Sequence, residues 1–301
     1  MNNILKNAIP NIIGSNRPLD VKIFLNSARI PSEIAFMESY LLPGLSACGD
    51  NVEVIKGDYE PCDIAVILFS PRQGDCATLR FKRRIRYLHP TNLLICEMPV
   101  LRGGEKLYTR FGFDHVHRLG RFSNCMFDRN RFEKIGRKIE PWRKDGRNIV
   151  IASQVQGDYS LDGIDIDEWV KCVVEYASAN HGRPIVVRPH PLDLEFENRH
   201  TFEKNIVISR NSLEYDIHQA AAWVSYTSGS SVDAVLAGVT SIALSRNNLA
   251  WDVSMHRMDC IGTFFAPDRT DWCNMIAHLQ WDRDEILSGL AWSSLRSHIQ
   301  F

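Results

Sequence analysis

The chain has 301 residues and a net charge of −1, and 45% of its residues are hydrophobic. This length and apolar content can bury two cores of ordinary domain size, and no stretch has the composition of a disordered protein. No apolar run reaches the length of a membrane span, and residues 1–6 lack the apolar core of a signal peptide. We therefore expect a two-domain, cytoplasmic protein without a membrane anchor.

The cysteine and histidine patterns predict neither disulfides nor a metal site. The eight cysteines are scattered without a CxxC pair, and several lie in apolar runs, where cysteine behaves as a small buried hydrophobe. His115 and His117 beside Asp114 are at strand spacing but have no clear third ligand. We expect reduced thiols, no metal and no cofactor.

The first half of the chain alternates apolar strands with helices, which predicts a parallel sheet of Rossmann type. The segment 64–69 is almost wholly apolar and is therefore expected to be a central strand. The expected strands are 21–25, 52–55, 64–69 and 93–96, and the expected helices are 31–40 and 77–88.

A basic segment spans residues 72–147, with 19 Lys and Arg against 8 Asp and Glu, so that it carries +11 and the remainder −12. A basic surface interleaved with aromatic side chains suits a polyanion such as DNA. The same composition also fits a solvated helix face with arginines that pair internally, and both interpretations stay open. The residues proposed to contact DNA are Arg83, Arg84, Arg118, Arg121, Arg131 and Trp142.

The second half begins after the turn dipeptide Asp145-Gly146, which is the expected domain hinge. It repeats the pattern of strand, loop and helix, and neither half contains a GxGxxG or Walker motif, which argues against simple NAD or ATP binding. The expected strands are 148–152, 184–187, 206–209, 222–226 and 240–244, and the expected helices are 167–180, 232–237, 270–280 and 282–299.

Two unusual loops lie at the carboxyl ends of strands in this half, where parallel sheets bind ligands. The first is Arg188-Pro189-His190-Pro191, whose prolines fix the backbone so that Arg188 and His190 face the same cleft. The second, residues 227–231, is TSGSS, which leaves backbone N–H groups free at a helix start to attract a phosphate. Helix capping is the alternative interpretation of its serines.

The order RPHP, a strand, then SYTSGSSVDAVLAGVTSIAL resembles the nucleotide-sugar half of GT-B glycosyltransferases. It is similar to the capsule polysaccharide (Kdo) transferase type, to bacterial sialyltransferases with HP and SS motifs, and to phage glycosyltransferases. The likeness extends upstream through PWR (141–143), GRNIV (146–150) and QVQGDYSL (154–161). It implies an α/β protein with two Rossmann-like domains facing a central cleft. These are an acceptor-side domain (1–146), a nucleotide-sugar domain (147–280) and a terminal helix (281–301) that packs back on the first domain.

The resemblance also implies roles for individual residues. His190 would contact the donor nucleotide, and Ser230 and Ser231 its phosphate. The other donor-binding candidates are Gln154, Asp158, Arg188, Pro191, Ser228 and Gly229. The donor would be a UDP- or CMP-linked sugar, and transfer would need no metal.

A transferase also needs a base to deprotonate the acceptor hydroxyl. Glu97 is favoured because a Glu after this strand, followed by an arginine-containing loop, resembles the Kdo-transferase pattern, although Met98-Pro99 replaces the expected glycine. Asp75, at the end of the loop after strand 64–69, is the second candidate.

For the acceptor, the basic segment and the likeness to phage enzymes favour a 5-hydroxymethylpyrimidine, above all 5-hydroxymethylcytosine, in bacteriophage DNA. Such DNA modification would take place in the host cytoplasm. The alternatives are a transferase of capsule or surface polysaccharide synthesis, a sugar-nucleotide epimerase of the same layout, and a non-catalytic DNA-binding module.

Overall fold

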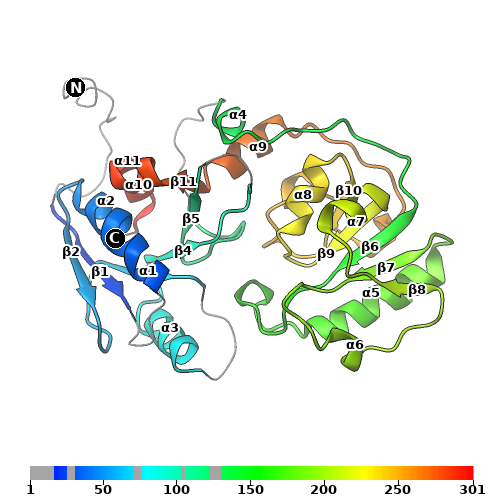
Figure 1. Ribbon diagram of the computed structural model, residues 1–301, viewed down its shortest axis with the longest axis horizontal. Coiled ribbons are helices and arrows are strands. Elements are labelled where there is room, and N and C mark those ends of the chain that lie inside the picture. The colour runs from blue at the N-terminus through cyan, green and yellow to red at the C-terminus, as the bar shows by residue number, and fades with distance from the viewer. Residues whose placement is uncertain (1–16, 26–30, 71–75, 103–105, 123–129, 301) are drawn as a thin grey trace.

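The computed structural model describes residues 17–25, 31–70, 76–102, 106–122 and 130–300. Two sheets form two α/β units, one on each side of the molecule in Figure 1. The first sheet has the strand order β11-β5-β4-β3-β1-β2, and the second has the order β10-β9-β6-β7-β8. Each sheet is covered by helices, as the alternating pattern predicted.

The first sheet is parallel across four strands and antiparallel at one edge. Strand β3 lies between β4 and β1 and is buried at every position, as its apolar sequence predicted. The two antiparallel strands were not predicted, because polar side chains interrupt the apolar pattern of β5 and because β11 has only three residues. The strands are β1 (Asp20–Phe24), β2 (Asn51–Ile55), β3 (Ile64–Leu68), β4 (Leu93–Glu97), β5 (Tyr108–Phe113) and β11 (Gln280–Asp282).

The helices of the first unit differ in how much they bury. The predicted helix 31–40 is longer than expected and continues as three consecutive helical pieces to Ser46, burying Met37, Leu41 and Leu45 in the core. Helix α3 buries only Ile85 fully, and its basic residues Arg80 and Arg84 are exposed. The helices are α1 (Pro31–Phe36), the π-helix η2 (Met37–Leu41), α2 (Leu42–Ser46), α3 (Ala77–Leu88) and α4 (Arg131–Ile135).

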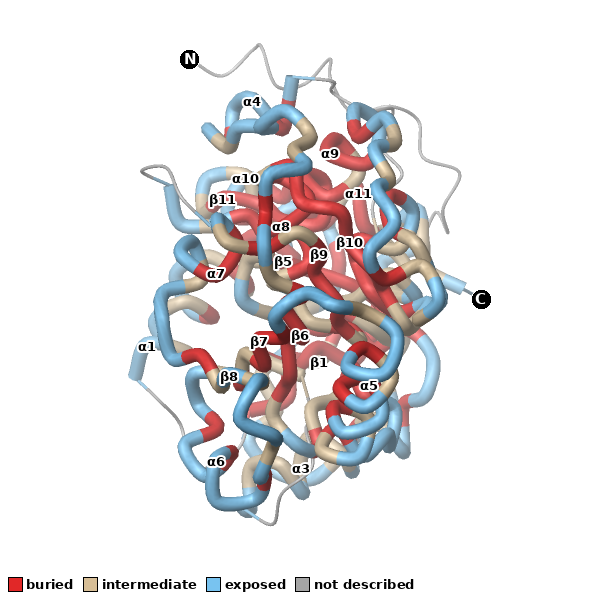
Figure 2. The backbone as a smooth tube through the Cα atoms, turned by 90° about the vertical axis from the view of Figure 1, so that its right-hand side faces the viewer, coloured by how far each residue is buried: buried red, intermediate tan, exposed pale blue. Residues whose placement is uncertain are grey.

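All five strands of the second sheet are parallel, and β6 lies at its centre. One hydrophobic cluster lies on each face of this sheet, and Figure 2 shows β6 and β9 as buried. The strands are β6 (Asn148–Ala152), β7 (Ile185–Arg188), β8 (Ile206–Ile208), β9 (Ala220–Ser225) and β10 (Thr240–Ala243). The helices are α5 (Ile166–Asn180), α6 (Phe196–Arg199), α7 (Leu213–Gln219) and α8 (Ser230–Leu236).

The end of the chain returns to the first sheet. The predicted helix 270–280 stops at Ala277 as α9 (Thr270–Ala277), and the chain then adds β11 beside β5. The predicted helix 282–299 is divided into α10 (Arg283–Leu287) and α11 (Leu290–Leu295), because Gly289 adopts a φ of +80°. Trp292 of α11 is buried in the first core and donates its indole N–H to Asp50, 2.6 Å away. Residues 280–295 thus pack with the first sheet.

The two units share a hydrophobic cluster. Leu101, Phe132 and Ile135 from the first part of the chain pack with Val235 of α8 and Trp272 of α9. The segment between the sheets is therefore packed against both units along part of its length. None of the helices in the described part of the chain is both long and apolar enough to cross a membrane.

Candidate functional site

The donor-site candidates lie on three loops that follow neighbouring parallel strands. The loops begin after β6, β7 and β9, and because these strands are parallel, their carboxyl ends meet at one edge of the second sheet. The loop after β6 contains a 3₁₀ turn, η3 (Tyr159–Leu161). In Figure 1 this green loop reaches from the second sheet toward the first unit.

Gln154 ties the loop after β6 to the loop after β9. Its Oε1 accepts hydrogen bonds from the backbone N–H (2.9 Å) and the hydroxyl (3.0 Å) of Thr227, and its Nε2 donates to Ser160 Oγ (3.1 Å). Asp158 Oδ1 accepts from the backbone N–H (2.9 Å) and hydroxyl (2.7 Å) of Ser160. Gln154 is only 6% exposed, so its amide supports the site rather than presenting itself to a donor. Sequence reasoning included Thr227 in the phosphate-binding turn without giving it a role of its own, and it assigned no role to Ser160.

The two serines predicted to hold a phosphate have different surroundings. Ser231 is 0% exposed, and its Oγ lies 2.7 Å from the carbonyl oxygen of Ser228 and 2.8 Å from Asn248 Oδ1. The predicted phosphate contact is therefore wrong for Ser231, because its hydroxyl is used inside the fold. Ser230 is partly exposed, and its Oγ lies 2.8 Å from Ser228 Oγ. Ser228, the exposed Gly229 and Ser230 are the part of the turn that a phosphate can reach.

Arg188 is paired with residues of the second unit, whereas the sequence predicted only that it faces the same cleft as His190. Its Nη1 donates to the carboxylate of Asp216 and to the carbonyl oxygen of Asn211, 2.8 Å away. Asp216 is buried and also accepts the hydroxyl of Ser209 at 2.8 Å. The ion pair fixes the start of α7 against the end of β7, so Arg188 has a structural role.

His190 is held in one orientation by its own loop. Its Nδ1 accepts the backbone N–H of Leu192 at 3.1 Å, so the neutral ring carries its proton on Nε2. Arg210 donates to the carbonyl oxygen of Asp193 (2.8 Å), and the Asp193 N–H donates to the carbonyl oxygen of His190 (2.9 Å). Pro191, which follows His190, is exposed. These contacts therefore hold the His190 ring and its loop in one orientation.

Glu97 is the last residue of β4 and lies at the carboxyl edge of the first sheet. Its Oε2 accepts the backbone N–H (3.0 Å) and hydroxyl (2.8 Å) of Ser70, and its Oε1 accepts the N–H of Met98 (2.8 Å). These contacts hold the carboxylate in one orientation. The second candidate base, Asp75, lies outside the described residues.

Arg110 is a site residue to which sequence reasoning gave no role. It is the cross-strand partner of Glu97 in the register of β4 and β5, and it is only 8% exposed. Its Nη1 donates to the carbonyl oxygen of Val116 at 2.9 Å, while its Nε has no hydrogen-bond partner in the described part of the chain. Burial lowers the pKa of Arg110 to about 10, and the charges of Glu97 and Asp158 oppose this shift.

The charge of Arg110 therefore interacts with one carboxylate from each unit, Glu97 in the first and Asp158 in the second. The sequence signal that could have found Arg110 is an arginine directly before the apolar stretch Phe111–Phe113, because a buried charge needs compensation.

Most of the residues predicted to contact DNA make ion pairs or hydrogen bonds with other residues of the protein. Arg131 is buried and pairs with Glu285 (2.6 Å), and Arg121 pairs with Asp114 (2.5 Å). The indole N–H of Trp142 donates to the carbonyl oxygen of Pro267 (3.0 Å). Arg118 makes a two-pronged ion pair with Asp252 (2.7 and 2.9 Å). For Arg131 the prediction of an open DNA surface is wrong, because its side chain is buried in an internal ion pair. Arg118, Arg121 and Trp142 are partly exposed but paired inside the protein, so their contact with DNA stays a prediction.

Helix α3 keeps part of the basic surface. Arg84 pairs with Asp58 at 3.2 Å, yet its side chain is 59% exposed. Arg83 is partly exposed on the same helix. The exposed charge of the predicted DNA-binding set is therefore concentrated on α3.

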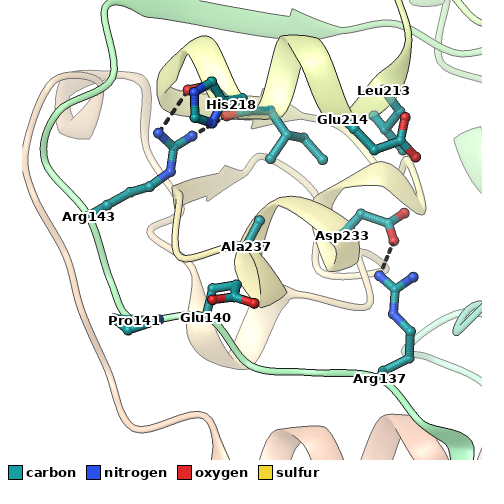
Figure 3. A pocket seen from close by; sticks show the side chains of 10 residues that line it. Arg137, Glu140, Pro141, Arg143, Leu213, Glu214, His218, Asp233 and Ala237 are labelled. Carbon is teal, nitrogen blue, oxygen red and sulfur yellow. Dashed lines mark hydrogen bonds and ion pairs between the residues drawn. The ribbon is translucent and has the colours of Figure 1, made fainter.

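A cavity of about 440 Å³ lies between the segment 137–143 and helices α7 and α8 (Figure 3). Its charged walls are occupied by internal contacts: Arg137 pairs with Asp233 at 2.9 Å, and Arg143 donates to the carbonyl oxygen of His218 at 2.8 Å. Burial raises the pKa of Asp233. None of the predicted donor-binding residues lines this cavity. Within the described residues, no group of three His, Cys, Asp or Glu side chains could hold a metal ion.

The KpsC beta Kdo 2,4 transferase of Thermosulfurimonas dismutans is similar in structure to the chain. The two are 12% identical, with a TM-score of 0.55, and the match covers 91% of this chain and 98% of that one. The chain has a GT-B fold. The predicted fold class and the resemblance to GT-B glycosyltransferases are both confirmed.

Two further solved structures match more weakly. The KpsC beta Kdo 2,7 transferase of the same organism is 12% identical, covering 90% of this chain and 98% of that one with a TM-score of 0.47. The UDP-GlcNAc 2-epimerase of Methanocaldococcus jannaschii is 9% identical, covering 93% of this chain and 98% of that one with a TM-score of 0.33. No protein-family model matches the chain, and neither does any curated protein sequence.

The different surroundings of the serines lead to a stability prediction. Ser231→Ala should lower the free energy of unfolding by about 1–3 kcal/mol, because Asn248 loses a buried partner. Ser228→Ala, the matched change at a partly exposed position, should cost less than about 0.5 kcal/mol. Urea denaturation measures both. Equal losses in the two variants would contradict the structural role of Ser231.

Proposed function

We propose that the protein is a glycosyltransferase that moves a sugar, a hexose or a pentose, from a nucleotide-sugar donor to an acceptor hydroxyl. The observation that supports this proposal is that the loop after β7 and the loop after β9 lie at the same edge of the second sheet. The ring of His190 is held in one orientation by its loop, and Ser228, Gly229 and Ser230 form a partly exposed turn that carries two hydroxyls. The similarity in fold to a Kdo transferase supports the same reaction class.

The proposed chemistry divides between the two units. Negative charge develops on the leaving phosphate, and hydrogen-bond donors from His190, Ser228 and Ser230 would stabilise it without a metal. Glu97, on the opposite sheet edge, would remove the acceptor proton. A UDP- or CMP-linked donor suits these loops, since a single imidazole and two hydroxyls can serve one or two phosphates.

Donor binding tests the proposal directly. One member of a panel of UDP- and CMP-linked sugars should raise the melting temperature of the wild-type protein, because a ligand bound only by the native state stabilises it. His190→Ala should abolish this stabilisation without unfolding the protein. His218→Ala, at an exposed position on α7, is the control and should retain it. Thermal stabilisation of His190→Ala equal to that of the wild type would refute the role of His190.

A charge-removing change tests the base. Glu97→Gln keeps the size of the side chain, so transfer should fall by about two to four orders of magnitude while donor binding is preserved. Glu133→Gln, at an exposed position of α4, should leave transfer unchanged. The readout is nucleotide release that depends on acceptor, which also distinguishes a transferase from an epimerase. Near-normal turnover of Glu97→Gln would assign the role to Asp75 instead.

Two acceptors follow from different observations. The basic, exposed face of α3 favours DNA that carries 5-hydroxymethylcytosine, as in bacteriophage DNA modification. The similarity in fold to a Kdo transferase favours a surface or capsule carbohydrate. The internal pairing of Arg118, Arg121, Arg131 and Trp142 weakens the case for DNA, which now depends mainly on α3.

Salt dependence and adduct formation separate these acceptors. If α3 binds duplex DNA, reversing Arg83 and Arg84 to Glu should reduce the slope of log affinity against log salt by about two, one for each lost phosphate contact. The double change Lys171→Glu with Lys204→Glu, at exposed positions of the second unit, should not alter it. Absence of any sugar adduct on 5-hydroxymethylcytosine DNA, with every donor that binds, would end the DNA hypothesis.

A further inference from the structure

The segment 114–119, which follows β5, is held by two separate loops of the second unit; we refer to it as the bridging segment. Both of these loops also hold the TSGSS turn at residues 227–231. The bridging segment in turn contacts Arg110, the cross-strand partner of Glu97. It therefore lies between the candidate donor site and the candidate base.

The first link is Tyr159, in the loop after β6. Its hydroxyl donates to the carbonyl oxygen of Asp114 at 2.7 Å. Its ring contacts His115, with ring centroids 4.9 Å apart, and the guanidinium of Arg86, which lies 4.1 Å from the ring centroid. Although it comes from the second unit, Tyr159 packs against the hydrophobic cluster of the first sheet that contains Ile85.

The residues on both sides of Tyr159 belong to the donor turn network. Asp158 accepts hydrogen bonds from Ser160, and Ser160 Oγ lies 2.7 Å from the hydroxyl of Thr227. Gln154, at the start of the same loop, accepts the backbone N–H of Thr227. Moving Tyr159 out of its site would therefore strain the contacts that define the start of the turn.

The second link is the pair Asn247 and Asn248. Asn247 accepts the backbone N–H groups of Arg118 (3.3 Å, to its carbonyl oxygen) and Leu119 (3.2 Å, to its Oδ1). Asn248 accepts the hydroxyl of Ser231 at 2.8 Å and donates to the carbonyl oxygen of Tyr226 at 3.0 Å. This link joins the other end of the bridging segment to the same turn.

The centre of the bridging segment connects to the candidate base. The carbonyl oxygen of Val116 accepts a hydrogen bond from Arg110 at 2.9 Å, and Arg110 is paired in register with Glu97. A displacement of the bridging segment would change how Arg110 lies relative to the carboxylates of Glu97 and Asp158. Hydrogen bonds and packed side chains can carry coupling between two sites, and here such contacts run from Tyr159 through the bridging segment to Arg110, the cross-strand neighbour of Glu97.

We propose that Tyr159 is a positioning residue that couples the donor turn to the Arg110–Glu97 pair through the bridging segment. The assignment of the two ends as donor site and base rests on the glycosyltransferase function proposed above. Tyr159 touches neither substrate in this scheme and acts by fixing the loop of Asp158 against the first unit. Because coupling is reciprocal, a change at the bridging segment should also be felt at the Thr227 turn.

Amide hydrogen exchange tests the coupling without any ligand or activity. In Tyr159→Ala, the amides of Arg118, Leu119 and Thr227 should exchange about tenfold faster or more, because local opening becomes easier. Amides in the central strands β6 and β9 should keep wild-type rates, which shows that the fold is intact. Tyr159→Phe keeps the ring contacts and loses the hydrogen bond to Asp114, so its effect should be smaller. Tyr215→Ala, at a tyrosine 55% exposed on α7, is the matched control and should change none of these amides.

Steady-state kinetics give the second readout. With a donor that stabilises the protein, Tyr159→Ala should lower kcat about tenfold and change the KM for donor by less than about threefold, because the groups that contact the donor are retained. Tyr159→Phe should recover most of the lost kcat.

The outcomes separate this inference from the proposed function. Faster exchange at residues 118–119 with an unchanged rate at Thr227 would overturn the coupling and leave Tyr159 as a simple contact between the units. Joint acceleration at both places supports the coupling, even if no nucleotide sugar binds, in which case the function alone fails. A higher KM for the donor with an unchanged kcat in Tyr159→Ala would also overturn the positioning role. If Tyr159→Ala does not fold, the same joint or separate response is measured in Tyr159→Phe.

Discussion

The buried amide of Gln154 is the interaction on which the candidate site depends. One amide supplies both an acceptor for the two donors of Thr227 and a donor for Ser160, and no carboxylate or apolar side chain could replace both functions. Buried polar groups must be paired, so this network defines one arrangement of the loops after β6 and β9. The accessible hydroxyls of Ser228 and Ser230 and the position of Tyr159 follow from that arrangement.

Charge in the basic segment is used mainly to join parts of the fold. Arg131 reaches Glu285 near the end of the chain, and Arg118 reaches Asp252 in the second unit, so residues distant in sequence are tied together. Arg110 differs, because it is buried and lies near carboxylates from both units without an ion pair to either within the described residues. A buried cation that is compensated partly from across an interface makes that interface sensitive to the position of both units.

The return of the chain to the first sheet makes the two units interdependent. Strand β11 completes the edge beside β5, and Trp292 fills the first core, so the first unit is built from both ends of the chain. The cluster around Trp272 also contains residues from both parts. The site between the units therefore rests on shared packing, in keeping with loops that are oriented before any ligand binds.

The sequence alone determined the parallel strands and the two loops of the second sheet, because apolar runs, prolines and glycine act over short distances. The apolar runs of β3 and β6 and the prolines beside His190 predict two strands and a loop from neighbouring residues alone. The tertiary structure decided which polar side chains remain available. Arg188 and Ser231 lie in loops whose sequences resemble binding sites, yet Arg188 pairs with Asp216 and Ser231 is hydrogen-bonded to Asn248. The partners of Arg118 and Arg131 lie more than a hundred residues away in the sequence. A local sequence pattern does not show which residues pair over such long distances in the chain. Only the folded structure therefore distinguishes a side chain that stabilises the site from one that is accessible to a substrate.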